Sequence, residues 1–106
     1  MPNVFKNTLY SVTSSLADVY VCPAATTAIV IGCQASNRSN TGTVALDLKV
    51  DDGVDNEFLL NDVAIPTNAS LQCIAGKLVL EAGDKIQAAT GVTNDISLVV
   101  SVLEIS

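Results

Sequence analysis

The segment from Gly42 to Asp51 alternates between apolar and polar or small side chains, and this alternation constrains the fold more than any other feature. Its apolar positions are Val44, Leu46, Leu48 and Val50. Successive side chains of a β-strand point to opposite faces, so the segment predicts a strand with one dry face and one solvated face. Similar patterns recur along the chain, and no segment carries a helical apolar stripe. We therefore predict an all-β protein built from stacked sheets.

The remaining apolar segments are short and are separated by turn residues. We expect strands over residues 17–22, 27–35, 42–51, 57–60, 69–74, 77–80, 85–89 and 95–105, with residues 5–13 as a weak first strand or arm and residues 63–65 as an extended segment. Turn signals recur roughly every 8–12 residues, which is typical of a sandwich or barrel. A chain of 106 residues without a linker fits one domain. The prediction is a single antiparallel β-sandwich over residues 1–106, of about eight short strands in a jelly-roll or immunoglobulin-like topology, with residues 1–13 as an N-terminal arm or first strand.

Charge and composition exclude several classes of partner. The net charge is −6, and the five basic residues are scattered. Because phosphate binding needs clustered lysine and arginine, we expect no nucleic-acid partner. The densest apolar run, residues 28–31, is far too short to span a membrane, and we see no secretion signal at the N-terminus.

The three cysteines, Cys22, Cys33 and Cys73, lie in apolar segments. An odd number of cysteines without a signal peptide indicates buried free thiols made in a reducing compartment. A cross-strand disulfide between Cys22 and Cys33 is the alternative that the sequence leaves open.

No catalytic or metal constellation stands out, and the chain contains no histidine. The commonest general base and the usual zinc ligand are therefore missing, so we expect neither an enzyme nor a cofactor. The acidic loop offers Asp52, Asp55 and Glu57 as candidate calcium ligands. Their order does not match an EF-hand, and a solvated hairpin loop explains the same residues.

Two strands carry further detail. In the strand at residues 27–35, Ile29, Ile31, Cys33 and Ala35 are expected to share a face, and Gly32 marks a bulge or a close backbone approach. In the last strand, Ile96, Leu98, Val100 and Val102 form one face, while the other becomes apolar at Leu103 and Ile105. A strand with two apolar faces is either central and covered by the N-terminal arm or part of a subunit interface.

Three segments together resemble the small β-sandwich virion proteins of tailed bacteriophages, particularly cyanophages and other marine phages. They are Val21–Gly32, with its Pro23 turn before a core strand, Lys77–Ile86, with its Ala-Gly-Asp turn, and Ser101–Ile105. The resemblance covers residues 4–105. It implies a neck, tail or decoration protein with no cofactor and no catalytic residue.

The resulting hypothesis is a phage structural protein, made in the host bacterial cytoplasm and located in the virion. It would self-associate and dock onto the capsid, neck or tail through contacts with other virion proteins. We expect Leu103 and Ile105 as interface anchors, with Phe5 and Tyr10 on the arm. The alternative is a carbohydrate- or receptor-binding module, such as a fibre tip, in which Tyr10 and Tyr20 would have to serve as the sugar platform.

Overall fold

The computed structural model describes residues 3–38, 42–74, 77–91 and 95–105. The loops expected at residues 39–41, 75–76 and 92–94 lie outside the described residues. In the described ranges the regular structure is entirely β, as the alternation predicts. The nine strands are β1 (Asn3–Ser11), β2 (Ala17–Val21), β3 (Thr27–Asn37), β4 (Val44–Asp51), β5 (Asn56–Ile65), β6 (Ser70–Gln72), β7 (Leu78–Leu80), β8 (Lys85–Thr90) and β9 (Ile96–Ile105).

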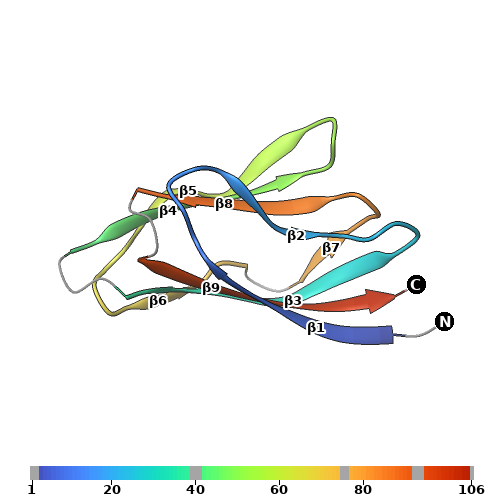
Figure 1. Ribbon diagram of the computed structural model, residues 1–106, viewed down its shortest axis with the longest axis horizontal. Coiled ribbons are helices and arrows are strands. Elements are labelled where there is room, and N and C mark those ends of the chain that lie inside the picture. The colour runs from blue at the N-terminus through green and yellow to red at the C-terminus, as the bar shows by residue number, and fades with distance from the viewer. Residues whose placement is uncertain (1–2, 39–41, 75–76, 92–94, 106) are drawn as a thin grey trace.

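The strands form two antiparallel sheets that pack face to face (Figure 1). Sheet A has the order β1-β9-β3-β6, with β7 also paired to β3, and sheet B has the order β2-β8-β4-β5. The pairing is that of one long hairpin wrapped around a core: β1 pairs with β9, β2 with β8, β3 with β6 and β7, and β4 with β5. This is a jelly roll, which decides between the two topologies that the sequence leaves open.

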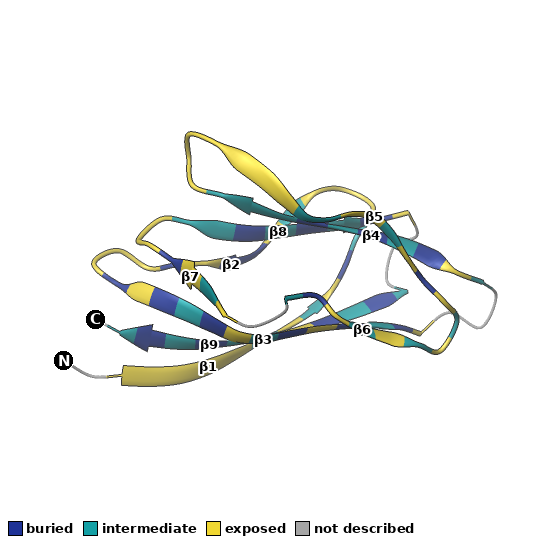
Figure 2. Cartoon of the chain, turned by 180° about the vertical axis from the view of Figure 1, so that it is seen from behind, coloured by how far each residue is buried: buried dark blue, intermediate teal, exposed yellow. Residues whose placement is uncertain are grey.

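The core lies between the two sheets and follows the predicted alternation (Figure 2). In β4 the buried apolar side chains are Val44, Leu46 and Leu48, and in β9 they are Ile96, Leu98, Val100 and Val102. Tyr20 is the only aromatic residue among the buried side chains of the described chain. The core is therefore built almost wholly from aliphatic residues, which suit a pleated surface.

A bulge in β3 overturns one detail of the prediction. The register with β9 shifts between Val30 and Gly32, so Ile31 is an extra residue without an opposite partner. Ala28 and Val30 face the core before the bulge, and Cys33 and Ala35 face it afterwards. The expected common face of Ile29, Ile31, Cys33 and Ala35 is therefore wrong, because one inserted residue reverses the alternation. Gly32 marks the bulge, and a Cβ there would meet nothing closer than Ser101 Cβ at 3.9 Å.

Strand β5 is longer than expected, because the segments predicted at 57–60 and 63–65 form a single strand with an irregularity between them. Asp62 has a φ of 54° there, and its backbone N–H donates to Asp47 Oδ1 at 2.6 Å. At the end of β5, the buried Asn37 of sheet A donates through Nδ2 to the carbonyl of Ile65 at 2.8 Å. This hydrogen bond links the two sheets at one end of the sandwich.

Candidate interaction face

The outer face of sheet A carries an apolar row that crosses four adjacent strands. Phe5 of β1 lies opposite Leu103 of β9, Leu103 lies opposite Ile29 of β3, and Ile29 lies opposite Val79 of β7. Cross-strand neighbours on one face have Cβ atoms about 4.5–5.5 Å apart, so these side chains form a continuous apolar strip. We call the outward side chains of β1, β9, β3 and β7 the outer face of sheet A.

Several large side chains of this face are strongly exposed. The exposed fraction is 72% for Phe5, 76% for Leu9 and 60% for Val79. Leu9 lies opposite Val99, which is 40% exposed, and the bulged Ile31 is 45% exposed. Single exposed apolar residues are ordinary on protein surfaces, but a contiguous group marks a contact site.

The strand positions of this face carry no charged side chain among the described residues. Between the apolar residues lie small or neutral polar ones: Asn3, Asn7, Ser11, Thr27, Gln34, Ser36, Ser97 and Ser101. The nearest charges along β7 are Lys77 and Glu81, just outside the strand. The outer face of sheet B differs, because it presents Asp18, Asp47, Lys49, Asp51 and Lys85. The two broad faces of the sandwich therefore have opposite character.

The structure brings together most of the residues expected at an interface. Phe5 and Leu103 are directly opposite each other, and Ile105 lies between Asn3 and Thr27 on the same face. Tyr10 is placed elsewhere, because it lies opposite Leu98 on the inward side of β1 and packs against the core. Strand β9 lies between β1 and β3, as expected for a central strand. Strand β1 pairs edge to edge with β9, however, and does not cover Leu103 and Ile105.

The candidate calcium loop uses its carboxylates for its own turn. Asp52 Oδ1 accepts the backbone N–H groups of Val54 at 2.9 Å and Asp55 at 2.7 Å. These hydrogen bonds, with Asp55 as the larger contributor, hold the pKa of Asp52 below its ordinary value. Asp55 and Glu57 line the same shallow hollow as Asp52. In the described part of the chain, no cluster of three or more acidic, cysteine or histidine residues is arranged to hold a metal.

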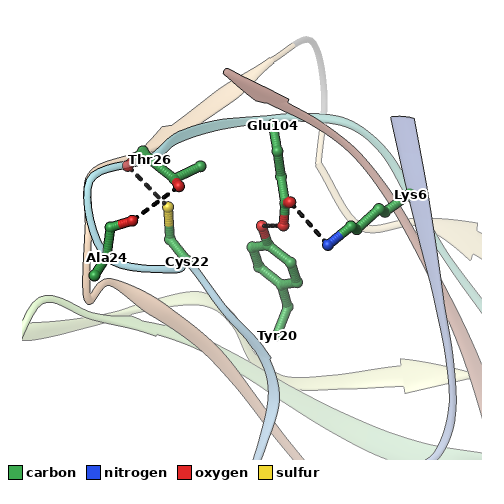
Figure 3. Close-up of polar contacts among 6 residues, drawn as sticks. All are labelled: Lys6, Tyr20, Cys22, Ala24, Thr26 and Glu104. Atoms are coloured by element: carbon green, nitrogen blue, oxygen red, sulfur yellow. Dashed lines mark hydrogen bonds and ion pairs between the residues drawn. The ribbon is translucent and has the colours of Figure 1, made fainter. Parts of the chain in front are cut away.

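A buried polar cluster, missed by sequence reasoning, joins the two sheets near the chain termini (Figure 3). Tyr20 of β2 donates its hydroxyl hydrogen to Glu104 Oε2 of β9 at 2.5 Å. Lys6 of β1 forms an ion pair with Glu104 Oε1 at 3.0 Å. Glu104 is only 7% exposed, so its carboxylate exchanges most of its water for these two partners.

The cluster shifts the pKa values of two of its members. The hydrogen bonds from Tyr20 and Lys6 stabilise the carboxylate and lower the pKa of Glu104. Burial, reinforced by the hydrogen bond to Glu104, raises the pKa of Tyr20 well above its ordinary value. Tyr20 therefore stays neutral and donates, while Glu104 stays ionised and accepts. Period-two spacing could have placed Glu104 inward after Val102, although nothing local identifies Tyr20 as its partner.

All three cysteines are buried and unbridged. Cys22 Sγ donates to the carbonyls of Thr26 at 3.3 Å and Leu80 at 3.7 Å, and Figure 3 shows the first of these contacts. Cys33 is paired along the backbone with Cys73, whose N–H donates to the Cys33 carbonyl at 2.8 Å. The alternative disulfide between Cys22 and Cys33 is not present in this fold.

Comparison with known proteins shows the fold and no family. No protein-family model matches the chain, and a search of curated proteins gives no match. Among solved structures, the capsid of the Helicobacter pylori bacteriophage KHP30 superposes with a TM-score of 0.60 at 12% identity, covering 98% of this chain and 93% of that one. The disulfide-linked pili of Bacillus endospore appendages give 0.55 at 11% identity, over 99% and 87%.

A third neighbour is a chain of the infectious bursal disease virus Gx strain. It gives a TM-score of 0.55 at 9% identity, covering 98% of this chain but 30% of that longer one. At such identities the similarity concerns the sandwich itself and assigns no activity to this chain.

Proposed function

We propose that the protein is a structural component of a bacteriophage particle, which self-associates through the outer face of sheet A and docks onto the capsid, neck or tail. The observation that carries the proposal is the uncharged apolar row Phe5–Leu103–Ile29–Val79 on a chain whose net charge is −6. The protein acts by binding other proteins, and no catalytic step is involved.

The fold agrees with this role, because a phage capsid protein shares it over nearly the whole length of both chains. A jelly roll is a rigid unit whose strands enclose one core, and it is a recurrent building block of viral capsids. Since the same fold also serves non-viral assemblies, the similarity supports a building-block function and leaves the place in the particle to experiment.

The occupant of the outer face of sheet A is a second copy of the chain. Two copies with a net charge of −6 repel each other wherever carboxylates meet. The outer face of sheet A avoids this repulsion, because its described strand positions are neutral, whereas the outer face of sheet B carries three aspartates against two lysines, Lys49 and Lys85. A self-complementary patch of this kind favours a symmetric contact between identical subunits.

The alternative of a carbohydrate-binding module has less support. Sugar sites usually present exposed aromatic rings. Tyr20 is buried and bonded to Glu104, and Tyr10 packs against the core, so neither presents an open ring face.

The oligomer is tested by light scattering after size exclusion, over a range of concentrations. We expect the wild type to exceed the 11.0 kDa of one chain. The double variant Phe5→Asp/Leu9→Asp should remain monomeric at every concentration, with an unchanged unfolding midpoint because both side chains are exposed. Leu103→Asp, which changes an expected interface anchor opposite Phe5, should also give a folded monomer.

A matched control adds the same two charges away from the outer face of sheet A. Val21→Asp/Val54→Asp replaces two exposed valines, one on sheet B and one in the acidic loop, and should associate like the wild type. A wild type that is monomeric at the highest concentration would refute self-association through this face, as would a control that dissociates equally.

The particle role is tested separately by quantitative mass spectrometry of purified virions, where the protein should be present in many copies. Its absence from virions would refute that role.

A further inference from the structure

Cys33 of β3 lies opposite Cys73, the residue that follows β6, although the two are 40 positions apart in the chain. Strand β3 pairs with β6 in the register Ser36↔Ser70, Ala35↔Leu71 and Gln34↔Gln72. The next position in that register is Cys33 opposite Cys73. The backbone hydrogen bond from Cys73 N to Cys33 O, 2.8 Å long, continues the ladder to this pair.

The two thiols also share a face and an environment. Cys33 is 1% exposed and Cys73 is 8% exposed, and both belong to the core between the sheets. Directly opposite residues of an antiparallel pair have Cα atoms about 4.5–5.5 Å apart, and disulfides span Cα separations of about 4.4–6.8 Å. Bridging the two therefore requires side-chain rotation and no displacement of the strands. Cys22 lies apart from this pair, since its thiol bonds to the carbonyls of Thr26 and Leu80.

We propose that Cys33 and Cys73 are a dithiol site that a low-molecular-weight disulfide, such as glutathione disulfide, oxidises to an intramolecular cross-link. The Cys73 thiolate attacks one sulfur of the oxidant, which forms a mixed disulfide and releases one glutathione thiolate. The Cys33 thiolate then attacks the Cys73 sulfur, which forms the Cys33–Cys73 bond and releases the second glutathione. The protein loses two protons and two electrons, and one glutathione disulfide becomes two glutathione thiols.

The surroundings favour this order of events. Cys73 is the more exposed of the two, so the oxidant reaches it first. The interaction between the thiols lowers the pKa of Cys73, and the same interaction together with burial raises that of Cys33. Cys73 is therefore the more readily ionised of the two thiols and attacks first. Once its sulfur is bound in the mixed disulfide, its interaction with Cys33 no longer raises the pKa of the second thiol. The cross-link would tie β6, a strand of three residues, to the long strand β3.

The site is tested on the full-length native protein, purified with reductant and then incubated with glutathione disulfide. The protein is then unfolded in urea at once with iodoacetamide, which blocks the free thiols, and the trypsin digest is analysed by mass spectrometry. We expect a disulfide link, stable without reductant and cleaved by dithiothreitol, between the peptide of residues 7–38 and that of residues 50–77. Trypsin leaves Cys22 and Cys33 in the same peptide, so the Cys22→Ser variant is needed and should give the same link.

A second readout uses stability. Oxidation should raise the unfolding midpoint of the wild type and of Cys22→Ser by roughly 5–15 °C, because the bond closes a long loop. Cys73→Ser should show no rise. Complete alkylation of Cys33 and Cys73 after exposure to the oxidant would overturn the proposal. It would also be overturned by a lasting glutathione adduct on Cys73, or by a link that disappears in Cys22→Ser.

Discussion

Tyr20 and Glu104 come from opposite sheets of the sandwich and meet in a hydrogen bond of 2.5 Å. The register of β2 against β8 shifts between Asp18 and Tyr20, so Val19 and Tyr20 both face the core. Glu104 follows the buried Val102 at the period of the strand. The bond therefore joins the last strand of the chain to the second strand at the end of the core near Lys6.

Removing the Tyr20 hydroxyl should destabilise the fold. In Tyr20→Phe the carboxylate of Glu104 keeps Lys6 but loses a buried partner, and we expect the free energy of unfolding to fall by about 1–3 kcal/mol. Urea denaturation gives the value. Tyr10→Phe is the matched control, since the Tyr10 hydroxyl has no hydrogen bond to another described residue and should change stability by less than about 0.5 kcal/mol. Equal losses in the two variants would contradict the assigned role of the bond.

The ionised Glu104 should make the free energy of unfolding fall at acid pH. Its pKa in the folded state lies below the ordinary 4.5, because Tyr20 and Lys6 stabilise the carboxylate. Because the folded pKa is lower than the unfolded one, the carboxylate contributes its full share to the free energy of unfolding above pH 4.5. That contribution is lost as the pH falls through the pKa of Glu104 in the folded protein. The wild type should therefore exceed Glu104→Gln in stability at about pH 7 and lose that advantage toward about pH 3. A constant difference across this range would contradict the linkage.

Tyr20 should make the free energy of unfolding fall at alkaline pH. Its pKa in the folded state is raised above the ordinary 10.0, so the neutral phenol contributes its full share to the free energy of unfolding below pH 10.0. That contribution is lost as the pH rises through the pKa of Tyr20 in the folded protein. The wild type should lose stability above about pH 10 more steeply than Tyr20→Phe. Ultraviolet titration of the tyrosines in the folded protein should accordingly show that one resists ionisation. Parallel losses in both proteins would refute this assignment.

Two glycines should respond differently to alanine. Gly83 has a φ of +88° in the turn between β7 and β8, a conformation that side chains rarely adopt, so Gly83→Ala should cost about 1–2 kcal/mol. Gly32 lies at the bulge with its nearest potential neighbour at 3.9 Å, so Gly32→Ala should be neutral within about 0.5 kcal/mol. Thermal unfolding of both variants distinguishes the two sites; the reverse order would be inconsistent with these backbone assignments.

The alternation of side chains predicted most strands, because it depends only on adjacent residues. It placed Leu46 and Leu48 in the core and separated Leu103 from Val102 correctly. It failed at Ile31, since a bulge is defined by two residues facing one on a partner strand, and that partner is about 70 residues away in the chain. The sequence pattern likewise could not distinguish a jelly roll from an immunoglobulin-like topology, because the order of strands in a sheet depends on contacts between residues far apart in the chain.

The candidate site was predictable only in part for the same reason. The apolar residues on the second face of the last strand predicted Leu103 and Ile105 as interface residues. Their apolar neighbours Ile29 and Val79 come from strands whose register no local pattern reveals. Tyr10 is expected at the interface only as a residue of the arm, because the sequence does not fix which side chains of the first strand point inward; its pairing with Leu98 turns it toward the core. The partner of Cys33 was equally hidden, since Cys73 is opposite it only through the pairing of β3 with β6.

Salt should strengthen the self-association proposed for the outer face of sheet A. The described strand positions there form no ion pairs, so screening removes no attraction, while it reduces the overall repulsion between two chains of net charge −6. Sedimentation at about 0.05 M and about 0.5 M sodium chloride should therefore show a lower dissociation constant at the higher salt. Phe5→Asp/Leu9→Asp should show no association at either concentration. Weaker association at high salt would instead indicate a contact made by opposite charges, such as Lys49 and Asp47 on sheet B, and would place the interface on that face.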